Sequence, residues 1–339
     1  MWKNYKQQFM KQAALANKEL DYINACLDYA YPIYTAGFPV IYDIHHLSLL
    51  VGYKKGYLYS VSNAPEFFYR KFVIPKKNGK QREIHEPLPS LKEIQHWILH
   101  NILSKFEISK FSKAYSAGSS VKHNARFHRN QNQLLKLDIK DFFPSISLYN
   151  VFGLFYSVGY TKQLSMMLAK LCCFDGRLPQ GAPTSPSISN IIMKNVDARL
   201  GAFAVKNKIR YTRYADDMAF SGDFKAGDVI SLTEKILKEY GFKLNKDKTR
   251  LMHNHQRQII TGITVNEIMN VKREARQFLR KEAYFINKFG LQAHLDKIGN
   301  TEPYYLHRLI GLASFALYVR PDNEEMKQIL GILKSAIEN

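Results

Sequence analysis

The stretch RYTRYADDMAFSG, residues 210–222, sets two adjacent carboxylates between residues that favour β-strands. Two strands that meet at a tight turn fit this pattern, because Ala215 and Asp216 are small and Asp tolerates unusual backbone angles. Asp216 and Asp217 would then lie at the tip of a hairpin. An isolated Asp-Asp pair is most simply a polar turn, so its meaning depends on the rest of the chain.

The chain around this hairpin is strongly basic. Its 339 residues include 49 Lys and Arg against 29 Asp and Glu, a formal net charge of +20. Such a charge indicates a polyanionic partner, of which nucleic acid is the leading candidate and an anionic membrane surface the alternative. The length allows two or three subdomains with a large core.

Several kinds of site and location are disfavoured by the same sequence. No run of about 18 apolar residues predicts a membrane span, and the N-terminus lacks the apolar segment of a signal peptide. Cys26, Cys172 and Cys173 fit a reducing cytosol, and without a CxxC pair we expect no structural zinc site. We therefore expect a cytoplasmic protein with no membrane partner.

A further acid lies in QLLKLDIKDFF, residues 133–143, where apolar and charged residues alternate. Alternation in a strand sends Leu135, Leu137 and Ile139 to one face and Lys136, Asp138 and Lys140 to the other. This predicts a half-buried strand with an acid on its open face. If the hairpin packs beside this strand, its two carboxylates converge with that of Asp138.

Three converging carboxylates imply a bound cation, because each otherwise raises the pKa of the others. Oxygen-only ligands favour a hard divalent ion such as Mg²⁺ or Mn²⁺. Two such ions bridged by aspartates catalyse in-line phosphoryl transfer. We therefore predict that the basic surface holds a polyanion and that the acids hold the metals that act on it.

The remaining elements indicate a mixed α+β order. We expect short helices in residues 1–70, a hairpin at 71–87 and a helix at 90–106 with Ser90 as N-cap. The other expected elements are a Pro/Gly-rich loop leading into a helix at 177–204, an amphipathic helix within 228–245 stopped by Gly241 and followed by a strand, and a mainly helical tail from about 270.

Five strings resemble the motifs of reverse transcriptases and occur in that family's order. They are the fingers hairpin IPKKNGKQREI (74–84), the first acidic motif LKLDIKDFFPSI (135–146), the nucleotide-pocket loop and helix GRLPQGAPTSPSISN (176–190), the catalytic box YADD (214–217) and the following motif GFKLNKDKTRLM (241–252). The resemblance implies a right-hand polymerase fold. The regions it implies are N-terminal helices and fingers at 1–134, with fingers also at about 150–185, an antiparallel-sheet palm at 135–268 and a helical, RNA-binding thumb at 269–339.

Two further strings resemble patterns of bacterial retron reverse transcriptases. NARFH, residues 124–128, matches NAxxH, and ITG, residues 260–262, resembles VTG with Ile in place of Val. Group II intron-derived and abortive-infection enzymes are the nearest alternatives. Intron enzymes usually carry a maturase region, and only about 70 residues follow position 270 here, enough for a thumb and little else.

The family resemblance assigns the catalytic roles. It implies that Asp138, Asp216 and Asp217 are the catalytic acids and metal ligands, with Asp217 more peripheral, and that the Ile139 carbonyl adds a ligand. The implied metal is Mg²⁺, with Mn²⁺ possible. Lys248 is expected to protonate the pyrophosphate; Lys246 is a near neighbour, and either lysine could instead contact template phosphate.

The resemblance also implies how the dNTP is bound. Phe143 would exclude a 2′-OH, whereas Phe142 would belong to the core. Gln180 would touch the nucleotide and Gly181 would permit close approach of the backbone. Lys76 and Arg82 would clamp the triphosphate, although Lys76 could instead be a solvated surface residue.

RNA contacts are expected at three places. Asn124 and His128 are four residues apart and share a helix face, so they either position or contact RNA or form a satisfied polar pair. Ile260, Thr261 and Gly262 are expected to bind RNA, with Gly262 permitting a tight backbone near the primer. Residues 271–290 predict a thumb helix with Phe278, Leu279, Phe285, Ile286 and Phe289 on an apolar side, and with Lys272, Arg276 and Arg280 as a basic stripe for phosphates or a solvated face.

The activity implied by the resemblance is RNA-directed DNA synthesis. A retron enzyme implies a cognate non-coding RNA as template and primer, its cDNA, and priming from an internal guanosine 2′-OH to give branched RNA–DNA (msDNA). It also implies a bacterial host, an accessory effector protein and defence against phage. A non-catalytic RNA-binding scaffold with a polymerase fold is the alternative of a different class.

Overall fold

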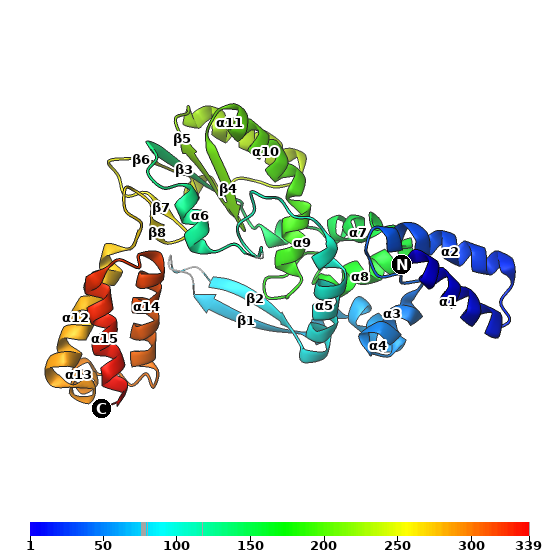
Figure 1. The fold of residues 1–339 in the computed structure, drawn as a ribbon, viewed down its shortest axis with the longest axis horizontal. Coiled ribbons are helices and arrows are strands. Elements are labelled where there is room, and N and C mark those ends of the chain that lie inside the picture. Colours follow the sequence, from blue (N-terminus) through cyan, green and yellow to red (C-terminus); the bar gives the residue numbers. More distant parts are fainter. Residues whose placement is uncertain (76–78, 80, 117, 339) are drawn as a thin grey trace. The chain divides into compact units, whose positions relative to one another are not determined.

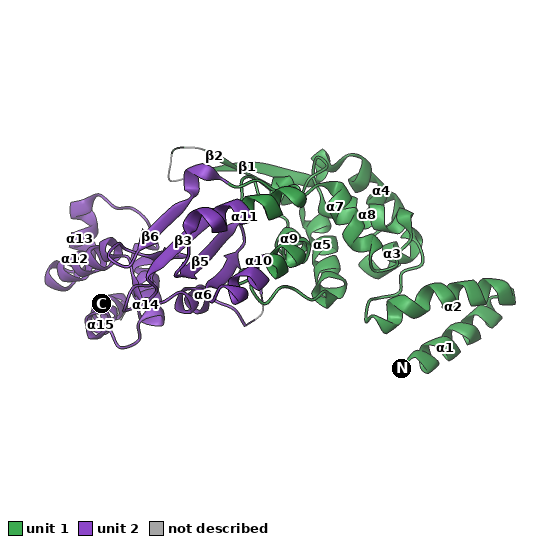
Figure 2. Ribbon diagram, turned by 90° about the horizontal axis from the view of Figure 1, so that it is seen from above, with its two compact units in different colours: residues 1–115, 139–199, 233–244 green, residues 116–138, 200–232, 245–339 purple. Residues whose placement is uncertain are grey.

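The computed structural model describes residues 1–75, 79, 81–116 and 118–338. The chain forms two compact units, each assembled from separate segments (Figure 2). Unit 1 comprises Met1–Tyr115, Ile139–Arg199 and Thr233–Leu244, and unit 2 comprises Ser116–Asp138, Leu200–Leu232 and Asn245–Asn339. The predicted fingers, palm and thumb are functional regions that differ from these two units, and their bounds stay a prediction.

Unit 1 begins with the expected short helices. These are α1 (Trp2–Leu15), α2 (Leu20–Thr35), α3 (Ile44–Val51), α4 (Lys55–Asn63) and the 3₁₀ turn η1 (Pro65–Phe68). Buried apolar residues lie on one side of each α-helix, which is the pattern of an amphipathic helix packed on a core. Helix α4 packs on α8 (Lys162–Cys172), a buried helix of the same unit.

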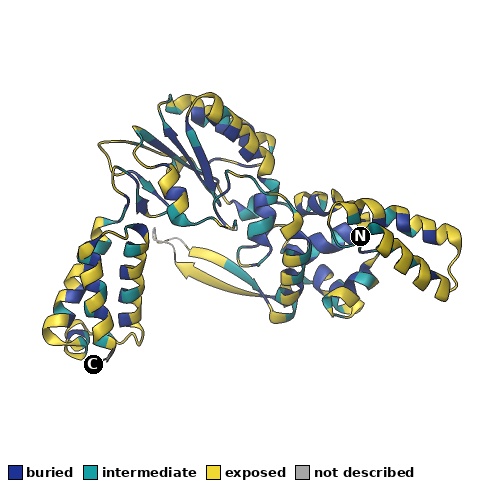
Figure 3. Ribbon diagram, viewed as in Figure 1, coloured by how far each residue is buried: buried dark blue, intermediate teal, exposed yellow. Residues whose placement is uncertain are grey.

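The predicted hairpin is present as β1 (Tyr69–Pro75) and β2 (Gln81–Pro87), which pair antiparallel from Tyr69 opposite Pro87 to Pro75 opposite Gln81. Strand β1 is largely exposed and β2 is exposed near the turn, as Figure 3 shows. Lys76, which was predicted to bind the triphosphate, lies outside the described residues.

The predicted cap of the next helix was wrong. Helix α5 (Pro89–Asn101) starts with Pro89 in its first turn, where a missing N–H costs nothing, and its N-cap is Leu88. Ser90 therefore lies inside the helix, and its hydroxyl is 2.6 Å from that of Tyr57. The helix is followed by the 3₁₀ turn η2 (Leu103–Lys105) rather than continuing to residue 106.

Helices make up most of the remainder of unit 1. They are η3 (Phe143–Ser145), α7 (Leu148–Tyr156), α8 and α9 (Ser185–Ile192). Two helices contain residues of both units, α10 (Lys194–Lys206) and α11 (Ala226–Glu239). Gly241, with a φ of +80°, follows α11 as predicted, but no strand comes next, since Leu244 forms only an isolated bridge with Ile139.

Unit 2 contains an antiparallel four-stranded sheet in the order β4-β5-β3-β6 (Figure 1). Its strands are β3 (Gln133–Asp138), β4 (Arg210–Tyr214), β5 (Asp217–Gly222) and β6 (Arg250–His253), with the 3₁₀ turn η4 (Lys246–Lys248) just before β6. Figure 3 shows that β3, β4 and β5 are largely buried. Both predicted strands of the Asp-Asp hairpin are confirmed.

The C-terminal part of unit 2 is a small sheet followed by helices. Its elements are β7 (Ile259–Ile260), β8 (Ile263–Thr264), β9 (Asn270–Val271), α12 (Arg273–Phe289), α13 (Leu291–Ile298), α14 (Tyr305–Val319) and α15 (Glu324–Glu338). One apolar cluster includes residues of these helices, of the small sheet and of α6 (Val121–Phe127). The helix predicted at 271–290 and the helical tail are thereby confirmed, and their assignment to a thumb stays a prediction.

A buried polar contact joins three of these helices. The Glu282 carboxylate of α12 lies 2.6 Å from His294 Nε2 of α13 and accepts a 2.6 Å hydrogen bond from the Tyr305 hydroxyl of α14. All three side chains are buried. Because a buried carboxylate needs such partners, this contact fixes which helix faces meet.

Candidate active site

The Asp-Asp turn is a two-residue connection at the tip of the β4–β5 hairpin. Tyr214 pairs with Asp217, which leaves Ala215 and Asp216 as the turn residues. Ala215 has a φ of +55°, an unfavourable angle for a residue with a Cβ atom. The predicted turn is therefore confirmed, and it holds Asp216 in one defined position next to Asp217.

The first acidic strand lies beside this hairpin. Strand β3 pairs antiparallel with β5, and the register sets Asp138 directly opposite Asp217. Residues directly opposite in an antiparallel pair have Cβ atoms about 5 Å apart. The predicted convergence of the acids from two separate strands is thus present in unit 2.

Asp138 is more enclosed than the strand pattern predicted. Its side chain was expected on an open face, but only 4% of the residue is exposed. The Asn245 amide donates to Asp138 Oδ1 at 3.1 Å, and Lys248 Nζ donates to Asp138 Oδ2 at 2.7 Å. The segment before β6 therefore covers this acid, which an alternating pattern within β3 cannot reveal.

Electrostatics shows how closely these acids are coupled. Burial raises the pKa of Asp216, and the negative charges of Asp138 and Asp217 raise it further. Partial burial lowers the pKa of Lys248, but its hydrogen bond to Asp138 and the attraction of the acids outweigh this and raise it overall. Additional positive charge at this site would therefore stabilise the ionised acids.

Two lysines supply positive charge to the acids in this structure. Lys248 contacts Asp138, and Lys136 Nζ lies 3.7 Å from Asp217 Oδ2. With the side chains so arranged, no three His, Cys, Asp or Glu groups within the described ranges are gathered as a metal site. The candidate ligands themselves are the carboxylate oxygens of Asp138, Asp216 and Asp217, which fits a hard divalent cation.

Unit 1 carries a separate pocket of about 380 Å³. Arg82 of β2 and Gln180 of the Pro/Gly-rich loop both line it, together with Asp141 and Arg177. The two residues predicted to bind the nucleotide from different motifs therefore share one pocket.

Gly181 explains how the loop reaches the hairpin. His85 N donates to the Gln180 carbonyl at 2.8 Å, so the loop is bonded to the β2 backbone. Gly181 has a φ of +125°, and a Cβ atom there would lie 2.6 Å from the His85 carbonyl oxygen. The close backbone approach predicted for this glycine is an approach to β2.

Phe142 and Phe143 differ in burial as predicted. Phe142 is buried, whereas Phe143 on η3 is only partly buried, with the two rings 5.3 Å apart. The Ile139 side chain is buried, and a role for its carbonyl stays a prediction.

The comparisons with known proteins agree with this geometry. Residues 74–300 match the family model described as reverse transcriptase (RNA-dependent DNA polymerase), which is most of the chain. The chain belongs to the reverse transcriptase family. It is an RNA-directed DNA polymerase of right-hand fold, as the motifs predicted.

Similar reverse transcriptases come from bacterial retrons. The chain is 32% identical over 277 residues to the retron Ec86 reverse transcriptase of Escherichia coli, covering 79% of this chain and 84% of that one. It is 34% identical over 288 residues to the retron Mx65 reverse transcriptase of Myxococcus xanthus, covering 77% and 67%. The predicted retron type is thereby confirmed.

Solved structures of other polymerases give weaker matches. Telomerase from Candida albicans, in complex with a telomeric RNA fragment, matches with a TM-score of 0.46 and 15% identity over 79% of this chain and 61% of that one. A foamy viral protease–reverse transcriptase matches with a TM-score of 0.40 and 14% identity over 80% of this chain and 46% of that one.

Among the described helices, none is long and apolar enough to cross a membrane.

The retron-type NAxxH residues are buried in this reverse transcriptase. Asn124 is 2% exposed and His128 is fully buried. His128 Nδ1 lies 2.7 Å from the Ser221 hydroxyl, and His128 Nε2 lies 2.7 Å from that of Thr212, which donates to Asn124 Oδ1 at 2.7 Å. The expectation of a direct RNA contact is therefore wrong for these side chains as they stand, and the satisfied polar pair is what the structure contains.

This polar chain ties α6 to the catalytic hairpin. Because Thr212 donates to Asn124, its oxygen accepts from His128 Nε2–H, which leaves Nδ1 to accept from Ser221. Thr212 lies on β4 and Ser221 on β5. A positioning role for Asn124 and His128, the other expectation, remains a prediction.

The ITG residues contact the same helix. Ile260 is buried in the apolar cluster, and the Thr261 hydroxyl donates to the Val121 carbonyl of α6 at 3.3 Å. Thr261 and Gly262 have φ angles of +45° and +85° in the turn between β7 and β8. Gly262 thus allows a tight turn, as predicted. Residues of both retron-type strings form hydrogen bonds that fix α6 in place.

The predicted basic stripe of α12 is only partly free for phosphate. Arg280 forms an ion pair with Glu325 of α15, whose pKa is lowered by that contact. Lys272 and Arg276 are partly buried at the start of the helix. The apolar side is also less complete than predicted, since half of Phe289 is exposed.

Sequence reasoning missed two residues of the site. Asn245 donates to Asp138, and Lys136 lies near Asp217. Asn245 belongs to the same quoted motif as Lys248, three positions earlier, so the motif contained the signal. Lys136 was placed on the open face with Asp138, but its partner lies on another strand.

Proposed function

We propose that this reverse transcriptase copies a cognate structured RNA into DNA at a site of two divalent cations, Mg²⁺ or alternatively Mn²⁺. The observation that carries the proposal is the register that sets Asp138 opposite Asp217, with Asp216 in the adjoining turn. These carboxylates, with the Ile139 carbonyl as an added ligand, would hold the ions. Bound divalent cations activate a primer hydroxyl and stabilise the charge that develops on pyrophosphate.

The chain's own residues bind and orient the substrates. Arg82 offers a planar guanidinium to triphosphate oxygens in the pocket that Gln180 also lines, with Lys76 as a further clamp. Phe143 would pack under the sugar and exclude a 2′-OH. Lys248 Nζ, which keeps its proton because of its raised pKa, would donate that proton to pyrophosphate.

The finer retron activity is also part of the proposal. Retron reverse transcriptases are the chain's relatives, and its charge of +20 suits a structured RNA. We expect that RNA to act as template and primer, with synthesis starting at an internal guanosine 2′-OH and giving msDNA. The proposal also includes an accessory effector protein, a role in defence against phage and a location in the bacterial cytoplasm.

The test is synthesis by the full chain on the RNA that copurifies with it, after that RNA has been sequenced and transcribed. With Mg²⁺ and dNTPs, we expect DNA that remains joined to RNA and is released by a debranching enzyme. Asp216→Asn should abolish synthesis. DNA released without debranching would favour an intron-derived or abortive-infection type of priming, and no incorporation by folded, RNA-loaded protein would favour the scaffold.

A further inference from the structure

A basic pocket of about 330 Å³ lies in unit 2, away from the catalytic hairpin's turn. Four cationic side chains line it, those of Lys122, Arg126, Arg129 and Arg320, and Asp322 is the one acid among its lining residues. We call it the α6 pocket. Lys122 and Arg126 belong to α6, Arg129 is the second residue after its end, and Arg320 directly follows α14.

Helical spacing explains why two of these cations share a side. Positions 122 and 126 are four apart, which places them on one face of α6, and Arg129 lies in the segment that follows the helix. Asn124, Ala125 and His128 are buried. Helix α6 and its C-terminal end therefore combine buried residues, which are fixed in the protein, with cations that line the pocket.

The cations of the α6 pocket are held in place by groups that do not neutralise them. Lys122 Nζ donates to the Tyr318 carbonyl at 2.6 Å and lies 5.2 Å from the Tyr318 ring. Arg129 Nε donates to the Glu267 carbonyl at 2.7 Å. These acceptors carry no net charge. The one acid that lines the pocket, Asp322, lies 3.5 Å from Arg320 Nε and pairs with that arginine.

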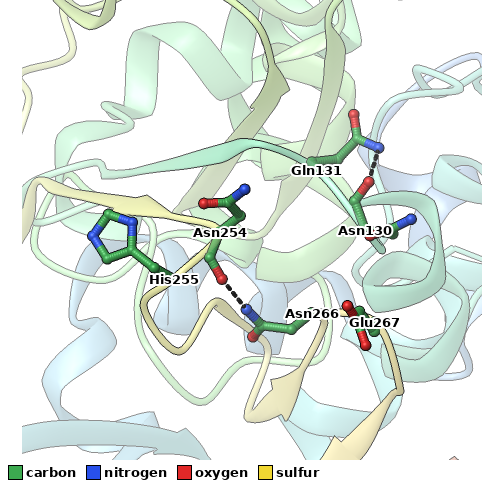
Figure 4. A pocket seen from close by; sticks show the side chains of 6 residues that line it. All are labelled: Asn130, Gln131, Asn254, His255, Asn266 and Glu267. Atoms are coloured by element: carbon green, nitrogen blue, oxygen red, sulfur yellow. Dashed lines mark hydrogen bonds between the residues drawn. The ribbon is translucent and has the colours of Figure 1, made fainter.

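A neighbouring pocket provides a contrast. Figure 4 shows that it is lined by Asn130, Gln131, Asn254, His255, Asn266 and Glu267. Its amides are used internally, since Asn266 Nδ2 donates to the Asn254 carbonyl at 2.9 Å and Gln131 Nε2 donates to the Asn130 carbonyl at 2.7 Å. These hydrogen bonds hold loops together, whereas three of the four cations of the α6 pocket form no ion pair with an acid of the described residues.

We propose that the α6 pocket binds backbone phosphate groups of the cognate RNA, an inference that rests on the proposed function. Guanidinium groups offer several fixed N–H donors to phosphate oxygens, and three of the four cations are arginines. Phosphate contacts position a nucleic acid without reading its bases. The buried Asn124 and His128 are positioning residues for this pocket, because they fix the helix that carries two of its cations and leads directly to a third.

Arg126 gives the sharpest test, because it is exposed and lies between the two buried residues. Arg126→Ala and Arg320→Ala are compared with Arg126→Lys, which keeps the charge, and with Lys206→Ala, which removes one exposed positive charge on α10. Binding of the copurifying RNA, transcribed and labelled, is measured at a series of KCl concentrations. Thermal melting checks that each full-length variant is folded.

We expect each alanine variant in the α6 pocket to lower the slope of log affinity against log salt by about one and to weaken binding about tenfold. Arg126→Lys should keep the slope, and Lys206→Ala should change neither quantity. DNA synthesis on an unrelated primed RNA template should stay at the wild-type rate for the control variant, Lys206→Ala.

The proposal is overturned if the pocket variants match Lys206→Ala in slope and affinity. A DNA strand with the same sequence as that RNA separates the two sources of phosphate, since a slope change with DNA but none with RNA would assign the pocket to the product strand and contradict the proposal. Failure of wild-type protein to synthesise DNA would count against the proposed function, whereas the salt slopes would still decide the pocket.

Discussion

Replacing His128 by Ala tests the structural account of the retron-type motif. The substitution removes two buried hydrogen bonds, each 2.7 Å long, to Ser221 and Thr212. Two such bonds contribute about 2 kcal/mol together, and the cavity left by a fully buried side chain costs about 2 kcal/mol more. We therefore expect the free energy of unfolding of the unit that contains His128 to fall by about 4 kcal/mol, a large part of a typical domain stability of roughly 5–15 kcal/mol.

The assay is urea unfolding of His128→Ala, Asn124→Ala and the double variant. Asn124→Ala leaves one Thr212 hydroxyl without its acceptor and should cost about 1 kcal/mol. Because both side chains belong to one hydrogen-bond chain, the double variant should lose less than the sum of the single losses. An unchanged unfolding curve for His128→Ala, combined with lost RNA affinity, would refute this reasoning, since it would mean that the side chain contacts RNA and is not buried.

Three other substitutions test separate parts of the molecule. Gly181→Ala should raise the KM for dNTPs at least tenfold in primer extension, because the added Cβ atom meets the His85 carbonyl oxygen and moves the loop; an unchanged KM would contradict the placement. Asp216→Asn should raise the melting temperature in EDTA at pH 7. The folded-state pKa of Asp216 is raised, so its ionised carboxylate destabilises the wild-type fold once the pH exceeds the unfolded-state pKa of this group. The stability gained by Asp216→Asn should therefore shrink towards acid pH, and a lower melting temperature of the variant at pH 7 would contradict this reasoning. Glu282→Gln should cost about 3 kcal/mol in urea unfolding, because it breaks a buried contact with His294, and a cost below about 1 kcal/mol would show that the contact adds little.

The elements that local pattern determines were predictable from the sequence. The alternation in residues 133–138, the small residues at the turn of the 210–222 hairpin and the spacing of apolar residues in α12 each follow from local geometry. Packing of the hairpin against β3 was also predictable, since only that arrangement brings the acids together. These features account for the confirmed fold and for the location of the candidate site.

What the sequence did not reveal depends on contacts between distant segments. The burial of Asp138 comes from residues more than a hundred positions away, Asn245 and Lys248. The burial of His128 depends on hydroxyls of β4 and β5, and its spacing from Asn124 fitted a binding pair equally well. The misplaced N-cap at Ser90 has a local cause: Ser90 with Glu93 three positions later fits a capping box, but Pro89 starts the helix one residue earlier.

Binding of Mn²⁺ to the catalytic acids is the most direct test of the central claim that carboxylates from β3 and the β4–β5 hairpin form one cation site. Anomalous scattering from crystals soaked in Mn²⁺ with a primed template and a dNTP analogue would locate the ions. We expect Mn²⁺ within about 2.3 Å of oxygens from both Asp138 and Asp216, a usual distance for hard divalent cations. Mn²⁺ bound elsewhere, with both carboxylates uncoordinated in a complex that holds template and nucleotide, would contradict the account.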